Sequence, residues 1–248
     1  MSDGNSILID VQDVWKAFGD HQVLKGVSMR VHKGSSDVIL GRSGIGKSVL
    51  LKSIVGLLRP ERGSIHVMGE QVIGMKTKEL NAIRTHIGYV FQYAALYDSL
   101  TVRENLEFPL RKHTTMSESE ITDAVMQQLE LVGLEDAVDK MPAELSGGMK
   151  KRIGLARAII KKPTLVLYDE PTAGLDPITA REISELILSL EEQFGITSIT
   201  VTHDIECAQL IANRIYILED GVFQHSGSFE DLRRSDDPTI RAFFKLVL

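Results

Sequence analysis

The sequence predicts an α/β domain built around a largely parallel β-sheet. Short β-rich apolar runs recur at residues 37–40, 165–168 and 198–202, and runs of this kind are typical of buried parallel strands. Amphipathic helical segments lie between these runs, and a glycine-rich stretch follows the first of them. Strands that alternate with helices indicate a sheet whose faces are covered by helices.

The N-terminal part is expected to begin with β-structure. Residues 7–14 alternate between apolar and polar side chains in the manner of a strand, and a second strand is expected near residues 23–31. The short strand at 37–40 comes next. Residues 48–58 are apolar on almost every side, which predicts a buried helix.

The middle of the chain is more polar and is expected to be helical. The spacing of Ile121, Val125, Leu129 and Val132 marks one amphipathic helix, and residues 146–160 predict another. Because strand-like runs resume only after this stretch, we interpret residues 93–156, approximately, as a helical insertion into the α/β core.

The C-terminal part returns to α/β structure. Apolar residues from Ile183 to Phe194 line one helix face, and strands are expected at 214–218 and 223–227 around a turn at 219–221. Apolar side chains near the end of the chain could complete the core or contact a partner, and the sequence leaves both roles open. These are Phe243, Phe244, Leu246 and Val247.

Composition excludes several classes of protein. The 248 residues include 28 Lys and Arg against 34 Asp and Glu, a net charge of −6, which argues against binding nucleic acid by bulk charge. Cys207 is the single cysteine, so the chain is no disulfide scaffold. No run approaches the ~18 apolar residues that mark a membrane-spanning helix.

Residues 41–48 fit the phosphate-binding pattern G-x-x-x-x-G-K-[ST] at every specified position. Its glycines allow the backbone to wrap so that successive N–H groups face phosphate oxygens, and the helix that follows favours an anion at its N-terminus. In this pattern Lys47 reaches the outer phosphates and Ser48 binds Mg²⁺. A plain glycine-rich turn is the alternative, but the strand before and the helix after favour a nucleotide site.

The run at 165–168 ends in two acidic residues, Asp169 and Glu170. The carboxyl edge of a parallel sheet is where ligands of α/β folds bind. Asp169 can therefore hold Mg²⁺, and Glu170 can orient or deprotonate an attacking water. Two acids at a strand end are common, so this interpretation depends on the phosphate-binding loop in the same domain.

Residues 145–149, Leu-Ser-Gly-Gly-Met, open a second helix that could bind an anion. Ser146 supplies a hydroxyl, and Gly147 and Gly148 leave backbone amides accessible. A simple helix cap is the alternative. The basic residues that follow are expected to form a solvated face rather than a binding patch; they are Lys150, Lys151, Arg152 and Arg157.

With these motifs the chain resembles the nucleotide-binding subunits of ABC transporters, over essentially its whole length. The motifs occur in family order: the P-loop at 41–48, Gln92, the signature at 145–149, the acidic strand end at 165–170, the D-loop ending at Asp176, and His203. The resemblance implies a RecA-like P-loop core, about residues 1–92 and 157–248, with N-terminal antiparallel strands. It also implies an inserted helical subdomain, about residues 93–156.

The resemblance also implies roles for single residues. ATP would lie between the P-loop of one chain and the signature of another in a head-to-tail homodimer, with Phe18 stacked on adenine and Trp15 as its nearby rival. Glu170, His203 and Gln92 would serve hydrolysis, and Ser48, Gln92 and Asp169 would serve Mg²⁺. The remaining ATP contacts within one chain would come from Gly41, Arg42, Ser43, Gly44, Ile45, Gly46, Lys47 and Val49. The signature of the second chain would add contacts from its Ser146, Gly147, Gly148 and Met149.

Arg42, Val49 and Met149 depart from the commonest residues of the family. With these three residues and the segments 91–110 and 176–179, the chain resembles the ATPases of Mla-type (MCE-protein, toluene-tolerance) lipid transporters. This resemblance implies phospholipid cargo, an integral-membrane permease, an MCE-domain lipid-binding protein, no nucleic acid, and a place on the cytoplasmic face of the inner membrane. Another cargo (amino acid, metal or drug), or a soluble ABC ATPase without a permease, are the alternatives.

The segment after Gln92 faces the permease in this family. Its apolar side chains could form a groove for a short permease helix, or could pack within the helical subdomain, and both roles stay open. They are Ala94, Ala95, Leu96, Tyr97 and Leu100.

Overall fold

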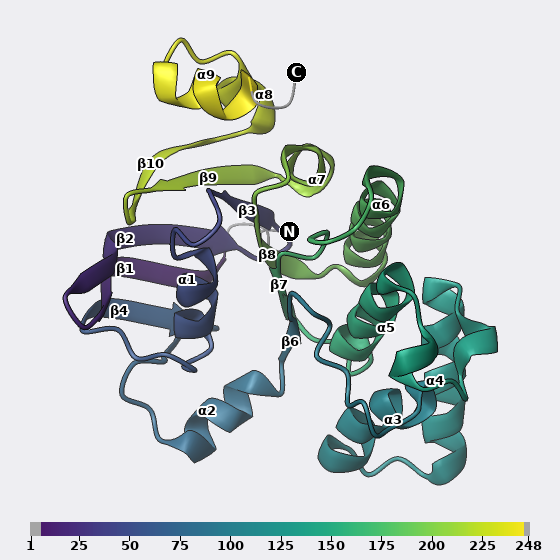
Figure 1. The fold of residues 1–248 in the computed structure, drawn as a ribbon. Helices are drawn as coiled ribbons and strands as arrows, with labels where there is room; N and C mark the ends of the chain where they lie inside the picture. The colour runs from purple at the N-terminus through teal and green to yellow at the C-terminus, as the bar shows by residue number, and fades with distance from the viewer. Residues whose placement is uncertain (1–5, 246–248) are drawn as a thin grey trace.

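The computed structural model describes residues 6–245, which form two β-sheets and a set of helices (Figure 1). The first sheet is antiparallel, with strand order β2-β1-β4-β5. Its strands are β1 (Ile7–Phe18), β2 (His21–His32), β4 (Arg62–Val67) and β5 (Glu70–Gln71). The two expected N-terminal strands are confirmed, and both are longer than predicted.

The second sheet has six strands in the order β10-β9-β3-β8-β7-β6. It is parallel except for β10, which pairs antiparallel with β9, so the predicted sheet class is confirmed. Every residue of β3, β7 and β8 is buried, as expected for central parallel strands. The strands are β3 (Ser36–Leu40), β6 (Ile87–Val90), β7 (Leu165–Asp169), β8 (Thr197–Thr202), β9 (Arg214–Glu219) and β10 (Val222–Gly227).

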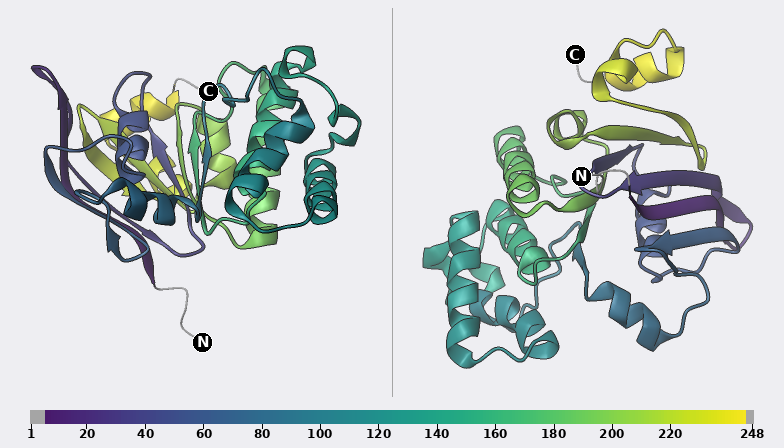
Figure 2. Two further views of the ribbon diagram at one scale, coloured as in Figure 1. Left: turned by 90° about the horizontal axis from the view of Figure 1, so that it is seen from below. Right: turned by 180° about the vertical axis from the view of Figure 1, so that it is seen from behind.

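Three apolar clusters hold the molecule together. The first joins the antiparallel sheet to α1 (Lys47–Ile54) and one face of the second sheet. The second joins the opposite face to α6 (Pro177–Phe194) and α7 (Ile205–Ile211). The carboxyl ends of β3, β7 and β8 therefore lie between covered faces, which fixes the loops that follow them (Figure 2).

The third cluster belongs to the helical middle, at the lower right of Figure 1. It is formed by α3 (Val102–His113), α4 (Glu118–Val132) and one face of α5 (Gly147–Ile159), with short 3₁₀ turns at Glu135–Ala137 and Pro142–Glu144. Leu155 and Ile159 of α5 pack in the second cluster as well. A division at residue 156 therefore cuts through α5, the helix that connects the insertion to the sheet.

The predicted helix at 48–58 is too long, because α1 ends at Ile54. Gly56 has a φ of 66°, a left-handed conformation that ends helices and suits glycine. The N–H groups of Leu57 and Leu58 both donate to the carbonyl of Lys52, which closes the end of the helix. The apolar pattern continues past the point where the backbone turns away.

Several other elements lie outside the sequence prediction. α2 (Thr77–Arg84) has no buried residue and so carries little apolar pattern. α8 (Phe229–Arg233) and α9 (Pro238–Lys245) follow β10. The ring of Phe244 packs edge-on against Phe229 at 5.4 Å, on the second cluster, whereas Leu246 and Val247 lie outside the described residues. No helix within residues 6–245 has the length and apolar character needed to cross a membrane.

Candidate functional site

The glycine-rich loop runs from the end of β3 to the start of α1. Gly46 is the residue before α1 and has a φ of 113°, where a Cβ atom would lie 2.5 Å from a side-chain carbon of Val23 on β2. No side chain caps the first turn of α1, so its N–H groups are left for another acceptor. The loop thus has the geometry of an anion site that only glycine permits at residue 46.

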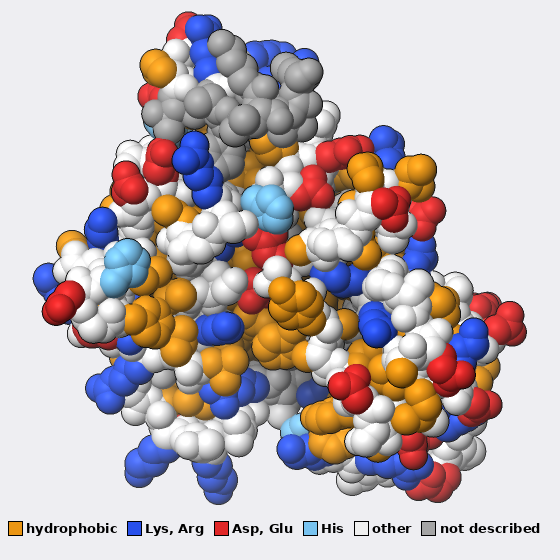
Figure 3. Space-filling view, viewed as in Figure 1, with side chains coloured by type: hydrophobic (Ala, Val, Ile, Leu, Met, Phe, Trp, Pro, Cys, Tyr) orange, Lys and Arg blue, Asp and Glu red, His pale blue; other side chains and the backbone are white. Residues whose placement is uncertain are grey.

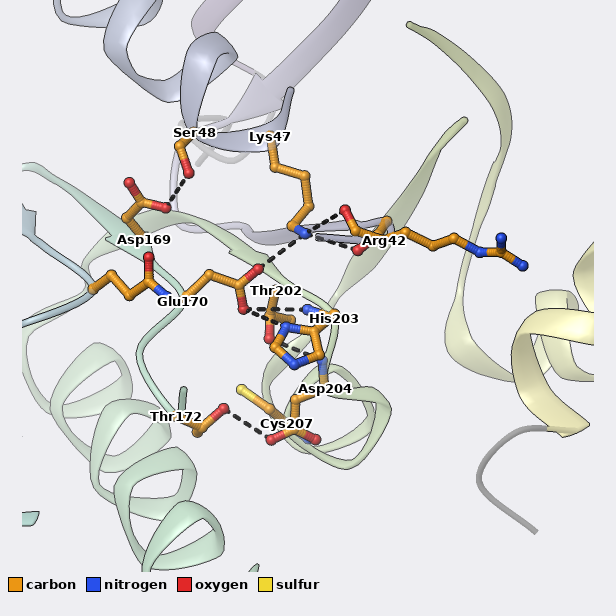
Figure 4. A network of polar contacts seen from close by, with 12 residues as sticks. Arg42, Lys47, Ser48, Asp169, Glu170, Thr172, Thr202, His203, Asp204 and Cys207 are labelled. Atoms are coloured by element: carbon orange, nitrogen blue, oxygen red, sulfur yellow. Dashed lines mark hydrogen bonds and ion pairs between the residues drawn. The ribbon is translucent and has the colours of Figure 1, made fainter. Parts of the chain in front are cut away.

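Lys47 lies at the centre of a buried polar network (Figure 4). Its Nζ donates to the carbonyls of Gly41 at 2.7 Å and Arg42 at 3.1 Å, and lies 2.9 Å from a carboxylate oxygen of Glu170. The side chains of Lys47 and Glu170 are 4% and 9% exposed. The two opposite charges are therefore paired and largely shielded from solvent. The Arg42 side chain points away from this pair in Figure 4.

Ser48 and Asp169 also meet across the loop. The Ser48 hydroxyl donates to Asp169 Oδ1 at 2.5 Å, and the Tyr89 hydroxyl of β6 donates to the other oxygen of Asp169 at 3.3 Å. Burial, reinforced by this carboxylate, raises the pKa of Tyr89 so that it stays a donor. No cluster of three or more His, Cys, Asp or Glu side chains suited to a metal occurs in the described part of the chain. A hydroxyl and one carboxylate suit Mg²⁺, which keeps several waters and substrate phosphates as ligands.

Glu170 has a φ of 50°, unusual for a residue with a side chain. Its N–H donates to the carbonyl of Val201, and its carboxylate oxygen Oε2 lies 2.8 Å from Nδ1 of His203. The His203 backbone N–H donates to the same oxygen at 3.3 Å. The carboxylate is thus held between the ammonium of Lys47 and the imidazole of His203.

The segment that carries His203 is fixed by Asp204. This carboxylate accepts from the N–H of Cys207, which caps α7, and from the hydroxyl of Thr172 at 2.8 Å. Histidine and acidic side chains gather in the middle of the face shown in Figure 3, with apolar side chains beneath them. Residues from three separate loops therefore converge on one partly open site.

Gln92 reaches this site through its backbone. Its carbonyl accepts a hydrogen bond of 2.7 Å from Nζ of Lys151, which also donates to the carbonyl of Glu170 at 3.0 Å. Lys151 is 6% exposed. Burial lowers the pKa of its ammonium to about 8, against the opposing charges of Glu170 and Asp169. Both carbonyls therefore accept hydrogen bonds from the same buried lysine on α5.

Phe18 ends β1 and is 50% exposed. The ammonium of Lys16 lies 5.2 Å from the centre of its ring and is held at 2.6 Å by Glu61. The adjacent strand β2 carries Val23 against Gly46, which places the two strands beside the loop. Trp15 instead bonds to Asp13 and lies under Arg62, so Phe18 is the better candidate for stacking a base.

The signature residues lie at the start of α5. Ser146 and Gly147 are exposed, and the Ser146 hydroxyl accepts from the N–H of Met149 at 3.2 Å. Among described contacts, none joins these residues to the P-loop. Instead Cβ atoms at Gly147 and Gly148 would approach Leu175 and Thr179. Asp176, between them, accepts from the N–H groups of Ile178 and Thr179 as the cap of α6.

Residues 24–173 match the protein family described as "ABC transporter". The "Probable ribonucleotide transport ATP-binding protein mkl" of Mycobacterium leprae is 44% identical, over 96% of this chain and 68% of its own length. The "Intermembrane phospholipid transport system ATP-binding protein MlaF" of Haemophilus influenzae is 40% identical, over 97% of this chain and 91% of its own. The chain belongs to the ABC transporter ATPase family.

A solved structure agrees with this assignment. The dimeric structure of a post-hydrolysis state of the ATP-binding cassette MJ0796, bound to ADP and phosphate, has a TM-score of 0.82 to this chain and is 33% identical. The alignment covers 89% of this chain and 98% of that one. The fold predicted from the sequence is therefore confirmed as that of an ABC ATPase, an enzyme that binds and hydrolyses ATP.

One expectation about this ABC ATPase is wrong. The basic residues after the signature do not form a solvated face, because Lys151 is buried and the guanidinium of Arg157 donates to the carbonyl of Ala94 at 2.8 Å. The sequence contained a signal for Lys151, which is four and eight residues before the buried Leu155 and Ile159 and so lies on the same helix stripe. The sequence predicts no role for Tyr89 or Thr172, because no motif or spacing marks either residue.

Proposed function

We propose that this ABC ATPase hydrolyses ATP as one half of a head-to-tail homodimer and thereby powers phospholipid transport through a membrane permease. The observation that carries the catalytic part is the carboxylate of Glu170, held between Lys47 and His203 beside the glycine loop. The identity of 40% with MlaF over nearly both full lengths supports the lipid cargo.

Binding of a triphosphate would change the partners of Lys47. The N–H groups of residues 41–48 and the Lys47 ammonium favour phosphate oxygens, so Lys47 exchanges the Glu170 carboxylate for a phosphate. Glu170 is then free to accept a proton from water, and His203 on its other side orients it. The pair seen here is thus a resting arrangement that substrate separates.

Ser48 and Asp169 would hold Mg²⁺, since their oxygens already lie within 2.5 Å of each other at the loop. The bound ion would neutralise charge on the phosphate oxygens. Gln92 is a further candidate through its side chain, in line with the resemblance, although the described contacts involve its carbonyl.

A second copy of the chain would complete the site. The signature residues Ser146 and Gly147 are exposed, and among the described contacts none joins them to the phosphate loop of their own chain, so another chain's ATP would be their acceptor. MJ0796 is described as dimeric, which supports this arrangement. Phe18 would stack on the adenine.

The permease would dock beside Gln92. Four aromatic side chains are exposed in this part of the chain, with Tyr93 at 86%. They are Phe91, Tyr93, Tyr97 and Phe108. Two of them flank Gln92 in the sequence, and the rings of Tyr97 and Phe108 lie 5.0 Å apart. A short amphipathic helix would cover such side chains, and this contact would hold the ATPase at the cytoplasmic face of the inner membrane. An MCE-domain lipid-binding protein would complete the transporter, as in the resemblance above.

Purification from membranes tests the proposal. A tagged chain should be recovered with an integral-membrane protein and an MCE-domain protein, and the complex in proteoliposomes should move a fluorescent phospholipid only with ATP. The Glu170→Gln complex is the matched control and should move none. Recovery of soluble partners alone would contradict the transporter, and ATP-driven movement of a ribonucleotide, amino acid, metal or drug instead would contradict the lipid cargo.

A further inference from the structure

Lys151 occupies an unusual position for a lysine. It is 6% exposed, and its ammonium forms hydrogen bonds to two backbone carbonyls, those of Gln92 and Glu170, rather than an ion pair. Burying a cation is unfavourable unless its donors are satisfied, so two well-placed acceptors are required to hold it there. The side chain therefore fixes both carbonyls relative to α5.

The Glu170 carbonyl belongs to a residue with an unusual backbone conformation. Glu170 has a φ of 50°, and such a conformation persists only where surrounding contacts over-determine it. Its N–H is held by the Val201 carbonyl and its own carbonyl by Lys151. A rotation of this peptide would move the carboxylate that Lys47 and His203 hold.

Lys151 also lies on the same helix as the signature. α5 begins directly at the signature, and Lys151 follows Gly148 by three residues, so the exposed signature amides and the Lys151 side chain belong to the same rigid turns. A displacement of the signature therefore moves the Lys151 ammonium and, with it, the carbonyls of Gln92 and Glu170.

We propose that Lys151 is a positioning residue that couples the signature, which serves the partner's ATP, to Glu170 and Gln92, which serve the ATP of its own chain. This inference rests on the proposed head-to-tail dimer. In that dimer each α5 contacts the ATP of one site at its N-terminus and supports the glutamate of the other site through Lys151. Hydrolysis at the two sites would be linked through this residue.

The first experiment compares Lys151→Met with Lys151→Arg and with Lys150→Met, a control on the same turn. Lys151→Met should keep ATP affinity and melting temperature near those of the parent, whereas kcat should fall by about 10- to 100-fold because the glutamate is misplaced. The Hill coefficient for ATP should fall towards 1. Lys151→Arg should restore part of both, because it keeps donors to the carbonyls, and Lys150→Met should change neither.

The second experiment assigns the site that Lys151 serves. It uses dimers of two differently tagged chains carrying Gly147→Asp, which disables one signature, together with Lys151→Met. With both changes in one chain, the site with the intact signature uses the chain that lacks Lys151, so activity should be nearly lost. With the changes in opposite chains, that site keeps its Lys151 and should retain about the activity of the dimer with Gly147→Asp alone.

The opposite pattern, or equal activity in the two arrangements, would overturn the inference. So would a Lys151→Met homodimer with unchanged kcat and Hill coefficient, or one whose loss of kcat is matched by equal losses of ATP affinity and melting temperature, because a purely structural lysine would behave in that way. A parent chain that does not hydrolyse ATP at all would overturn the proposed function itself, which these variants leave intact when only the coupling is absent.

Discussion

The two helices that begin at the P-loop and at the signature differ in how their N-termini are satisfied. α1 starts after Gly46, with no side-chain cap, and its first residue Lys47 is buried and paired with Glu170. α5 starts after Ser146, whose hydroxyl accepts from the N–H of Met149, and Gly147 beside it is exposed. One start is enclosed by groups of its own chain, whereas the other faces outward with its own cap.

This difference separates two tasks. The enclosed start carries the Lys47–Glu170 ion pair, which ATP would separate in the proposed mechanism, so binding there would alter the group proposed to activate water. The exposed start holds only its own cap, the hydrogen bond from the Met149 N–H to Ser146, and in the proposed dimer it would respond to a phosphate brought by another chain. In the proposed dimer a single chain would therefore supply the binding loop, and a second chain would complete the hydrolytic site.

Glu170→Gln should give the largest effect and tests the enclosed start. The amide cannot accept a proton from water, so kcat should fall by about 10²- to 10⁴-fold. Because Gln does not pair with the Lys47 ammonium as a charge, ATP affinity should be kept or rise. Single-turnover hydrolysis and equilibrium ATP binding measure the two effects, and hydrolysis at the parent rate would reject the assigned role.

Gly147→Asp should give the next largest effect and tests the exposed start. A Cβ at this position meets only Leu175, at 3.6 Å, so the chain itself accommodates the change, whereas at Gly148 a Cβ would lie 2.8 Å from Thr179. A carboxylate there would repel the partner's phosphate, and the ATP-dependent dimer should weaken by about 100-fold. Sedimentation with ATP and Glu170→Gln as the background measures it; Gly147→Ala is the control, and an undiminished dimer would contradict the assignment.

Lys47→Ala should weaken ATP binding by about 10- to 100-fold, the loss expected for a hydrogen bond to a charged group. It also leaves Glu170 buried without its cation, so the melting temperature should fall. The double variant Lys47→Ala with Glu170→Gln should recover the melting temperature but not the affinity. Unchanged affinity in the single variant would contradict the P-loop assignment.

The enclosed start could be predicted from the sequence because its parts are local. The loop at 41–48 is contiguous, and Asp169 ends β7 with Glu170 directly after it, so residue order alone brings each group to the sheet edge. The end of α1 could not be read from its apolar residues, because one glycine at position 56 overrides the pattern. β6 has only four residues and was missed, although it carries Tyr89 to Asp169.

The link between the two starts could not be predicted from local pattern. Lys151 bonds to carbonyls that are 59 and 19 residues away in the chain, and backbone acceptors leave no residue type to recognise. Its spacing from Leu155 and Ile159 indicated burial, but the positive charges beside it favoured a solvated face. Long-range contacts to backbone atoms are the part of this site that requires the structure.

Ser146→Ala should give the smallest effect on stability and sharpens the contrast between the two starts. Loss of a helix cap costs about 1 kcal/mol of unfolding free energy, measurable by chemical denaturation without nucleotide. Ser117→Ala removes the equivalent cap of α4, far from the signature in sequence, and should cost a similar amount. The two variants should differ only with ATP, since the Ser146 hydroxyl alone could donate its O–H to the partner's phosphate. If Ser117→Ala weakened the ATP-dependent dimer as much as Ser146→Ala, the exposed start would act through helix stability and not through contact with the nucleotide.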